Sequence, residues 1–283
     1  MTLIAVDHVT YGYSLNPVLQ NISVSFEPGE IVSLLGPNGS GKTTLLKLLM
    51  GFYRPQSGQV LLEGQSVSAI PPKQLARRIA YVPQVHRLSF GYRVLDVVLM
   101  GRMPHKPFFS RYSKADEQAS LNALERLSIA HLKDRPYTEV SGGERQLIMI
   151  ARALVQGADI FIMDEPVSGL DYGNQIRLLG RIADLARSGF TFIKTTHFPD
   201  HALWISDRVV MLKNGQIIAD GQTKETINKT NLYKLYNTHV DVLGLSDGGR
   251  ICVPEALRQL GDRGGMRQSK TYGGIRGFAC AAG

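Results

Sequence analysis

The stretch Leu34–Leu46, LLGPNGSGKTTLL, limits the possible folds of this chain more than any other segment. Gly36, Gly41, Lys42 and Thr43 fit the pattern G-x-x-x-x-G-K-S/T. Glycines let backbone N–H groups turn inward around an anion, and the helix that begins near Lys42 directs its positive end to the same point. Such a loop connects a strand to a helix, so it predicts an α/β fold with a phosphate-binding site.

The side chains of this loop suit a nucleoside triphosphate. Lys42 can reach the β- and γ-phosphates, and the Thr43 hydroxyl can ligate Mg²⁺. A glycine-rich turn with a solvated lysine is the alternative, but an apolar run precedes the loop and the helical pattern TTLLKLLMGF follows it. The residues predicted to bind the nucleotide here are Gly36, Pro37, Asn38, Gly39, Ser40, Gly41, Lys42, Thr43 and Thr44.

Three short apolar runs predict a buried sheet: Ile31–Leu35, Ile160–Met163 and Phe190–Ile193. Each is continuous rather than alternating and is followed by a turn and a helical pattern, which is typical of parallel strands covered on both faces. Residues 3–10 and 22–27 instead resemble strands around a turn and indicate an antiparallel edge sheet. The predicted fold is an α/β P-loop NTPase core with a mostly parallel sheet and an antiparallel N-terminal β-subdomain.

The middle of the chain predicts an inserted helical subdomain at about residues 88–158. It contains the segment SKADEQASLNALERLSI, in which Ser113 is a candidate helix cap. The nucleotide-binding domain is expected to span residues 1–256. Residues 257–283 are rich in glycine without periodicity and are expected to be a disordered tail.

A pair of carboxylates follows the second apolar run, in the sequence IFIMDEP. A site for Mg-nucleotide needs an acidic residue at the end of a neighbouring strand, and Asp164 would hold Mg²⁺ through water. Glu165 would accept a proton from the water that attacks the γ-phosphate. An acidic turn closed by Pro166 is the alternative, but the phosphate loop in the same chain favours catalysis.

The composition of the chain says more about its cellular compartment than about its function. No apolar run approaches the ~18 residues of a membrane-spanning helix, and the N-terminal segment lacks a signal-peptide pattern, so a cytosolic protein is expected. Cys252 and Cys280 form neither a disulfide framework nor a metal site. The net charge of +8 is compatible with nucleic acid, an anionic membrane surface or simply solvated faces.

A second anion site is predicted within VSGGERQLIMIARAL, residues 140–154. Ser141 is a candidate N-cap, and Gly142 and Gly143 leave bare N–H groups at the start of an amphipathic helix. One nucleotide cannot easily use both anion sites within one subunit. With these motifs in this order, the chain resembles the ATP-binding-cassette ATPases over residues 1 to about 250.

The resemblance implies roles for four further residues. Tyr13 would stack on adenine, with Tyr11 as the competing candidate, and Gln84 would contact Mg²⁺ and the attacking water. His197 corresponds to the histidine that senses the γ-phosphate, and Asp171 lies in a loop that crosses a dimer interface. The implied catalytic residues are therefore Glu165, His197 and Gln84. The implied ATP ligands are those of the phosphate loop with Tyr13, Ser141, Gly142, Gly143 and Asp171, and the Mg²⁺ ligands are Thr43, Gln84 and Asp164.

The chain departs from the family pattern at four positions: Val140, Glu144, Val167 and Gly169. None of these removes a phosphate donor or the base. Gly169, in the loop that crosses the dimer interface, is expected to loosen the coupling between the two nucleotide sites of the dimer.

The resemblance also implies partners. Two copies would pack head to tail around two ATP molecules, and hydrolysis would release them. The run GRMPHKP within residues 98–118 is similar to importers of iron–siderophore, haem, cobalamin and related chelates, with residues 85–112 forming the permease groove. The chain would then lie peripherally on the cytoplasmic face of the inner membrane, work with an external binding protein and bind no nucleic acid. A soluble cassette ATPase acting on nucleic acid or ribosomes, and a molybdate or tungstate subunit, are the alternatives.

Overall fold

The computed structural model describes residues 2–14, 16–84, 91–107, 110–246 and 248–257. The predicted tail at residues 257–283 thus lies outside the described residues except for Leu257. None of the described helices is long and apolar enough to cross a membrane.

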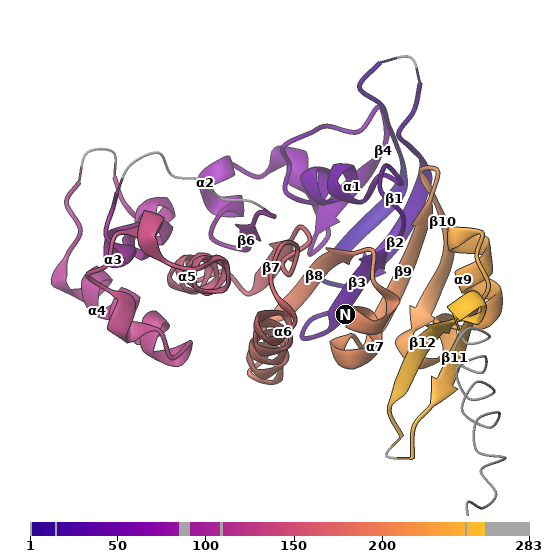
Figure 1. Cartoon of the computed structure of the whole chain (residues 1–283). Coiled ribbons are helices and arrows are strands. Elements are labelled where there is room, and N and C mark those ends of the chain that lie inside the picture. Colours follow the sequence, from indigo (N-terminus) through magenta and orange to yellow (C-terminus); the bar gives the residue numbers. More distant parts are fainter. Residues whose placement is uncertain (1, 15, 85–90, 108–109, 247, 258–283) are drawn as a thin grey trace, which may run out of the picture.

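A six-stranded sheet forms the centre of the molecule, with the spatial order β10-β9-β3-β8-β7-β6 (Figure 1). All neighbouring pairs are parallel except β9 and β10. The strands are β3 (Ile31–Leu35), β6 (Ile79–Val82), β7 (Ile160–Met163), β8 (Thr191–Thr196), β9 (Arg208–Lys213) and β10 (Gln216–Gln222). The mostly parallel sheet predicted from the apolar runs is confirmed.

A second, antiparallel sheet has the order β2-β1-β4-β5. Its strands are β1 (Ile4–Tyr11), β2 (Leu19–Phe26), β4 (Ser57–Leu62) and β5 (Gln65–Ser66). The predicted antiparallel N-terminal sheet is therefore present, although β2 begins at Leu19 rather than residue 22 because Leu19 is buried and pairs with Tyr11. A separate hairpin, β11 (Val240–Gly244) and β12 (Arg250–Pro254), completes the described chain.

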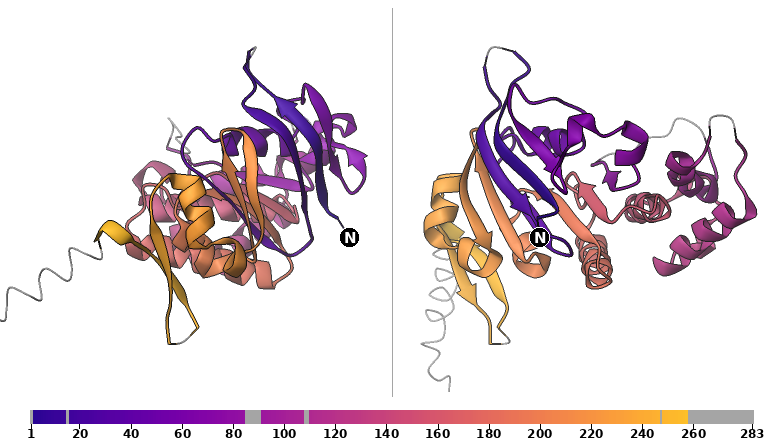
Figure 2. Two further views of the ribbon diagram at one scale, coloured as in Figure 1. Left: turned by 90° about the vertical axis from the view of Figure 1, so that its right-hand side faces the viewer. Right: turned by 180° about the vertical axis from the view of Figure 1, so that it is seen from behind.

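Helices cover both faces of the central sheet. The α-helices are α1 (Lys42–Leu49), α2 (Pro72–Leu75), α3 (Val94–Leu99), α4 (Lys114–Arg126), α5 (Gly142–Val155), α6 (Tyr172–Arg187), α7 (Pro199–Ile205), α8 (Thr223–Thr226) and α9 (Lys229–Tyr236). Short 3₁₀ helices are η1 (Val67–Ala69), η2 (Met100–His105), η3 (Ala130–Leu132) and η4 (Tyr137–Glu139). Figure 2 shows α3, α4 and α5 beyond the β6 edge, away from β10 and the hairpin.

Two hydrophobic clusters explain why the strands read as continuous apolar runs. On one face of the sheet, Leu34, Ile162 and Ile193 pack with Leu46 of α1 and the antiparallel sheet. On the other face, Phe161 and its neighbours pack with α3 to α6. Since both faces of the sheet are buried, an apolar side chain at any position along these strands stabilises the fold.

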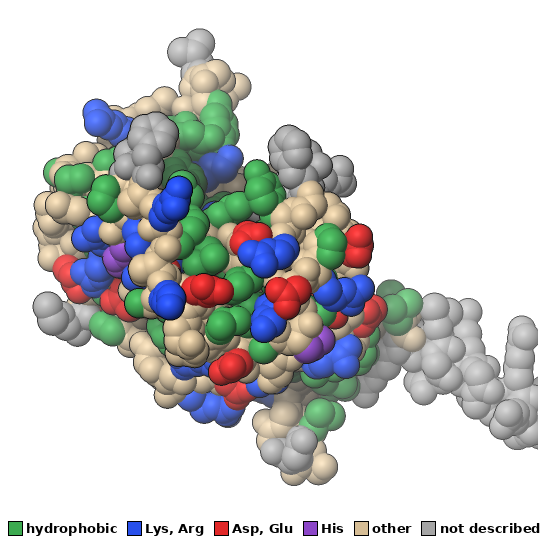
Figure 3. Space-filling model, turned by 90° about the vertical axis from the view of Figure 1, so that its left-hand side faces the viewer, with side chains coloured by type: hydrophobic (Ala, Val, Ile, Leu, Met, Phe, Trp, Pro, Cys, Tyr) green, Lys and Arg blue, Asp and Glu red, His purple; other side chains and the backbone are tan. Residues whose placement is uncertain are grey.

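Helices α4 and α5 begin at the capping residues predicted from the sequence. The Ser113 hydroxyl accepts the Asp116 N–H, and the Ser141 hydroxyl accepts the Glu144 N–H, each within a reciprocal capping box. On the face seen in Figure 3, beyond α3 and α4, basic and acidic side chains are interspersed with hydrophobic ones. The surface on this side is therefore electrostatically mixed.

Candidate nucleotide site

A pocket of about 460 Å³ opens between the phosphate loop and the ends of β6 and β7. It is lined by Tyr13, Val18, Asn38, Gly39, Gly41, Lys42, Thr43, Thr44, Gln84, Asp164 and Glu165. Gly39 and Gly41 have φ angles of +78° and +104°, a region that glycine adopts at low cost. The loop thereby leads from β3 into α1, and the predicted phosphate-loop residues lie together at one end of the sheet.

Lys42 is only 6% exposed, and its ammonium group donates to the carbonyl oxygens of Gly36 and Pro37 at 2.8 and 2.9 Å. Burial lowers its pKa, while Glu165 and Asp164 act to raise it. A Cβ atom on Gly36 would lie 2.8 Å from the Ser40 hydroxyl and 2.2 Å from the Leu212 carbonyl oxygen. The loop therefore has no room for a side chain at Gly36.

Oxygen donors suited to Mg²⁺ meet at the start of α1. The Thr43 hydroxyl donates to Asp164 Oδ2 at 2.8 Å, and Gln84 lines the same pocket. Hydroxyl, carboxylate and amide oxygens match the preference of Mg²⁺ for hard ligands, and such sites use few carboxylates together with substrate phosphates. In the described part of the chain, no group of three or more His, Cys, Asp or Glu could hold a metal by itself. The residues fit an ion that is bound together with a nucleotide.

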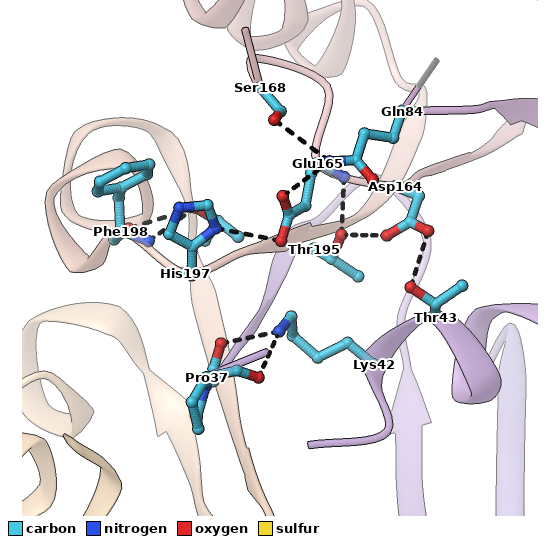
Figure 4. A network of polar contacts seen from close by, with 12 residues as sticks. Pro37, Lys42, Thr43, Gln84, Asp164, Glu165, Ser168, Thr195, His197 and Phe198 are labelled. Carbon is cyan, nitrogen blue, oxygen red and sulfur yellow. Dashed lines mark hydrogen bonds and ion pairs between the residues drawn. The ribbon is translucent and has the colours of Figure 1, made fainter. Parts of the chain in front are cut away.

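Glu165 lies at the centre of a polar network (Figure 4). Its carboxylate accepts a hydrogen bond from Gln84 Nε2 at 3.2 Å and lies 3.1 Å from His197 Nδ1. The side chain is 14% exposed, and the backbone has a φ of +42°, which is uncommon for a residue other than glycine. Held from two sides in a strained backbone position, this carboxylate has the fixed geometry expected of a general base.

Four contacts in this network, made by three residues, were missed from the sequence. The buried Thr195 hydroxyl contacts both Asp164 and Glu165, and the Ser168 hydroxyl accepts from Gln84 at 3.2 Å. The Tyr236 hydroxyl donates to the His197 carbonyl oxygen at 2.8 Å. The sequence offered a signal only for Thr195, which stands two positions before His197 in KTTH.

The structure distinguishes the two candidates for stacking on adenine. Tyr13 is 59% exposed and lines the pocket, and its hydroxyl lies 3.2 Å from that of Thr44. Tyr11 is instead stacked on Tyr53, with ring centroids 5.1 Å apart and an angle of 8°. One face of Tyr11 is therefore covered by protein, whereas Tyr13 is available to a base.

Four predicted ATP ligands outside the phosphate loop do not line this pocket, and within the loop Gly36, Pro37 and Ser40 are not part of its lining either. Ser141, Gly142 and Gly143 lie at the start of α5, and Asp171 caps α6 by accepting the Asn174 N–H at 2.9 Å. This hydrogen bond is the largest of the causes that lower the pKa of Asp171. A Cβ on Gly143 would lie 2.8 Å from the Asn174 side chain. Ser141, Gly142 and Asp171 are exposed, whereas Gly143 is buried against Asn174 of α6, and none of the four is part of the pocket at the phosphate loop.

Two grooves lie near the β6 edge. The first, of about 610 Å³, is lined by Met50, Gly51, Phe52, Arg54, Val67, Ser68, Ile70, Pro72, Leu75, Ala76, Ile79, Tyr81, Pro83, Arg152 and Gln156. The second, of about 570 Å³, is lined by Lys73, Ala76, Met103, Pro104, Lys106, Pro107, Ser110 and Tyr112. The groove predicted at residues 85–112 matches only the second, and residues 85–90 and 108–109 lie outside the described chain.

Comparison with known proteins gives relatives that are all ABC transporters or their ATP-binding subunits. The sequence profile described as ABC transporter matches residues 19–168. The molybdate import ATP-binding protein MolC of Haemophilus influenzae is 36% identical, over 83% of this chain and 88% of its own length. The ferric enterobactin transport ATP-binding protein FepC of Escherichia coli is 34% identical, over 81% and 85%. A solved ABC transporter described as of metal-chelate type, in an inward-facing conformation, superposes with a TM-score of 0.80 at 32% identity, covering 89% of this chain and 97% of the matched chain.

Proposed function

The chain belongs to the ABC transporter family, and on that premise we propose that it is the ATP-hydrolysing subunit of a membrane importer for a metal chelate. The observation that carries this proposal is the position of Glu165. Its carboxylate lies between Gln84 and His197 and lines the same pocket as Lys42 and Thr43. A base beside a phosphate loop is the arrangement that hydrolysis of a nucleoside triphosphate requires.

In the proposed reaction, Lys42 and the loop N–H groups bind the β- and γ-phosphates. Glu165 takes a proton from water as the water oxygen bonds to the γ-phosphorus, and the bond from that phosphorus to the bridging oxygen of ADP breaks. His197 and Gln84 hold the Glu165 carboxylate in place. Mg²⁺ held by Thr43 and Asp164 would neutralise charge on the phosphate oxygens.

A second copy of the chain would complete the site. Gly142 and Gly143 provide the N–H groups at the N-terminus of α5, beside the Ser141 side chain, but none of these residues lines the pocket of their own chain. A head-to-tail homodimer would place these groups against the γ-phosphate bound by the partner. ATP would then bridge two subunits, and its hydrolysis would remove the bridge.

We assign the groove beside β6 to the permease. It is lined by apolar residues such as Phe52, Ile70 and Leu75, with Arg54 and Arg152 among them, and suits a short amphipathic helix. The neighbouring groove around Met103 shares Ala76 and would extend the contact. Docking there would hold the subunit on the cytoplasmic face of the membrane, with an external binding protein supplying the chelate.

The charge distribution gives little support to nucleic-acid binding. Residues 258–283 hold five basic residues and one acidic residue, a net +4, which is half of the total of +8. In the described chain, Arg78 pairs with Glu63 and Asp159, and Arg208 pairs with Asp220. These two arginines are therefore paired locally, and the tail accounts for half of the net charge without a continuous basic surface on the described chain.

The decisive variant is Glu165→Gln, with Glu225→Gln, an exposed carboxylate on α8, as the matched control. Glu165→Gln should bind ATP, lose turnover by ~100-fold or more, and form an ATP-dependent dimer in sedimentation experiments. Wild-type turnover in this variant would refute the base assignment.

The transported substrate needs its own assay, because a 36% identical relative is named for molybdate import. The chain, reconstituted with its permease in vesicles, should hydrolyse ATP faster when the binding protein carries a ferric siderophore. Stimulation by molybdate alone would replace the chelate with an oxyanion. Stimulation by nucleic acid without membrane association would refute the importer proposal.

A further inference from the structure

The Thr195 hydroxyl makes two hydrogen bonds, one to each of the two carboxylate residues of the site. Thr195 is 0% exposed on β8, and its Oγ1 donates to Asp164 Oδ1 at 2.7 Å. The same oxygen accepts the Glu165 N–H, also at 2.7 Å (Figure 4). One hydroxyl is thus donor to the metal-site carboxylate and acceptor from the backbone of the candidate base.

The hydrogen bond from Thr195 to Asp164 fixes the orientation of the Asp164 carboxylate. Its Oδ1 is bound to Thr195 and its Oδ2 to Thr43, so the carboxylate is held between two hydroxyl groups from opposite sides. Rotation of the carboxylate would break both bonds together. Thr195 therefore holds the oxygen that faces the phosphate loop in a single orientation.

The second bond fixes the backbone of Glu165. This residue has a φ of +42°, a conformation that side chains other than glycine rarely adopt. A hydrogen bond to its N–H from a buried, β-branched residue with restricted χ1 favours this conformation over a relaxed one. Gln84 and His197 contact the carboxylate of Glu165, and Thr195 binds its backbone N–H.

We propose that Thr195 is a positioning residue for hydrolysis, which couples the orientation of Asp164 to the backbone of Glu165. The inference rests on the proposed ATPase mechanism, in which these two carboxylates act on one phosphate group. Thr195 itself is fully buried and does not line the nucleotide pocket. It acts because displacement of either carboxylate by even ~1 Å can cost a large factor in rate.

Three variants separate positioning from general stability. Thr195→Val keeps the shape and removes the hydroxyl, Thr195→Ser keeps the hydroxyl, and Thr191→Val is the matched control. Thr191 is also buried on β8, and its hydroxyl accepts the Gly29 N–H at 2.9 Å, so the control loses a comparable hydrogen bond. Thr195→Val should lower kcat by about 10- to 100-fold with less than about threefold change in ATP affinity, while Thr195→Ser retains most of kcat. Thr191→Val should leave kcat unchanged.

A second readout does not depend on turnover. In nucleotide-free protein, hydrogen exchange of the Glu165 amide should be slow in the wild type and in Thr191→Val, and about tenfold faster or more in Thr195→Val. Unchanged kcat in Thr195→Val, or an equal loss in Thr195→Ser and Thr195→Val, would overturn the inference. Should Thr195→Val fail to fold, fast exchange of the wild-type Glu165 amide would still overturn it. Wild-type protein without ATPase activity would instead refute the proposed function.

Discussion

Replacing Lys194 with methionine should stabilise the protein at neutral pH. Lys194 lies within β8, is 1% exposed, and packs between Ser33 of β3 and Met163 of β7. Among the described residues its ammonium group has one weak contact, 3.5 Å from the His201 carbonyl oxygen. Burial lowers its pKa to about 7. An amine in this position opposes folding whenever it is protonated.

The magnitude follows from the pKa. A fall from 10.5 to about 7 corresponds to about 5 kcal/mol, since each pKa unit is worth about 1.4 kcal/mol. The unfolded chain binds one proton more than the folded chain between these values, so the free energy of unfolding should rise with pH across this window. The cost is fully present below pH 7 and disappears above 10.5. Replacement of a buried charge by an apolar side chain of similar length should recover about 1–4 kcal/mol at pH 7.

Urea unfolding of the nucleotide-free protein at pH 7 and pH ~9.5 would measure this difference. The free energy of unfolding of Lys194→Met should exceed that of the wild type at pH 7, and the two values should approach each other at the higher pH. Lys224→Met, at an exposed position on α8, should change stability by less than about 0.5 kcal/mol at either pH. The claim that burial of the Lys194 amine destabilises the folded protein would be wrong if Lys194→Met is no more stable than the wild type at pH 7. It would also be wrong if the difference in stability does not depend on pH.

Four other substitutions test three separate parts of the structure. Lys42→Ala should weaken ATP binding by ~10-fold or more in calorimetry, because charged hydrogen bonds to the phosphates are lost; unchanged affinity would contradict that role. Tyr13→Leu should lower ATP affinity by about fivefold, and Tyr11→Leu should leave affinity near wild type while lowering the melting temperature. Asp116→Asn should destabilise the fold by about 3 kcal/mol, because Asp116 is buried against Arg102. Since hydrogen bonds lower the pKa of Asp116, its contribution should be present above the ordinary Asp pKa and be lost in acid, which thermal unfolding against pH would show.

Local features were predictable from the sequence because their causes are local. Ser141 and Glu144 cap α5 through bonds between residues three apart, and Gly41 allows the positive φ that starts α1. The apolar run Ile160–Met163 becomes β7 because both faces of the sheet are buried there. Each of these conclusions needs only neighbouring residues and general physical rules.

The contacts of the site were less predictable because they join distant segments. The sequence predicts a strand that ends at Ile193, since Lys194, Thr195 and Thr196 are polar, yet β8 continues through all three and buries them. Polarity normally marks the end of a buried strand, and here it marks the part of the strand that enters the site. Ser168 and Gln84 are 84 positions apart, so no local pattern could join them.

The strand order explains why the base has partners on both sides. β6, β7 and β8 are consecutive strands of the chain and lie side by side in the sheet, and their ends are followed by Gln84, Glu165 and His197. Glu165 therefore lies between the other two and contacts both. β6 also lines the groove assigned to the permease, through Ile79 and Tyr81, a few residues before Gln84. A partner that displaces β6 would move Gln84 relative to Glu165, so occupation of the groove and alignment of the base are connected through one short strand.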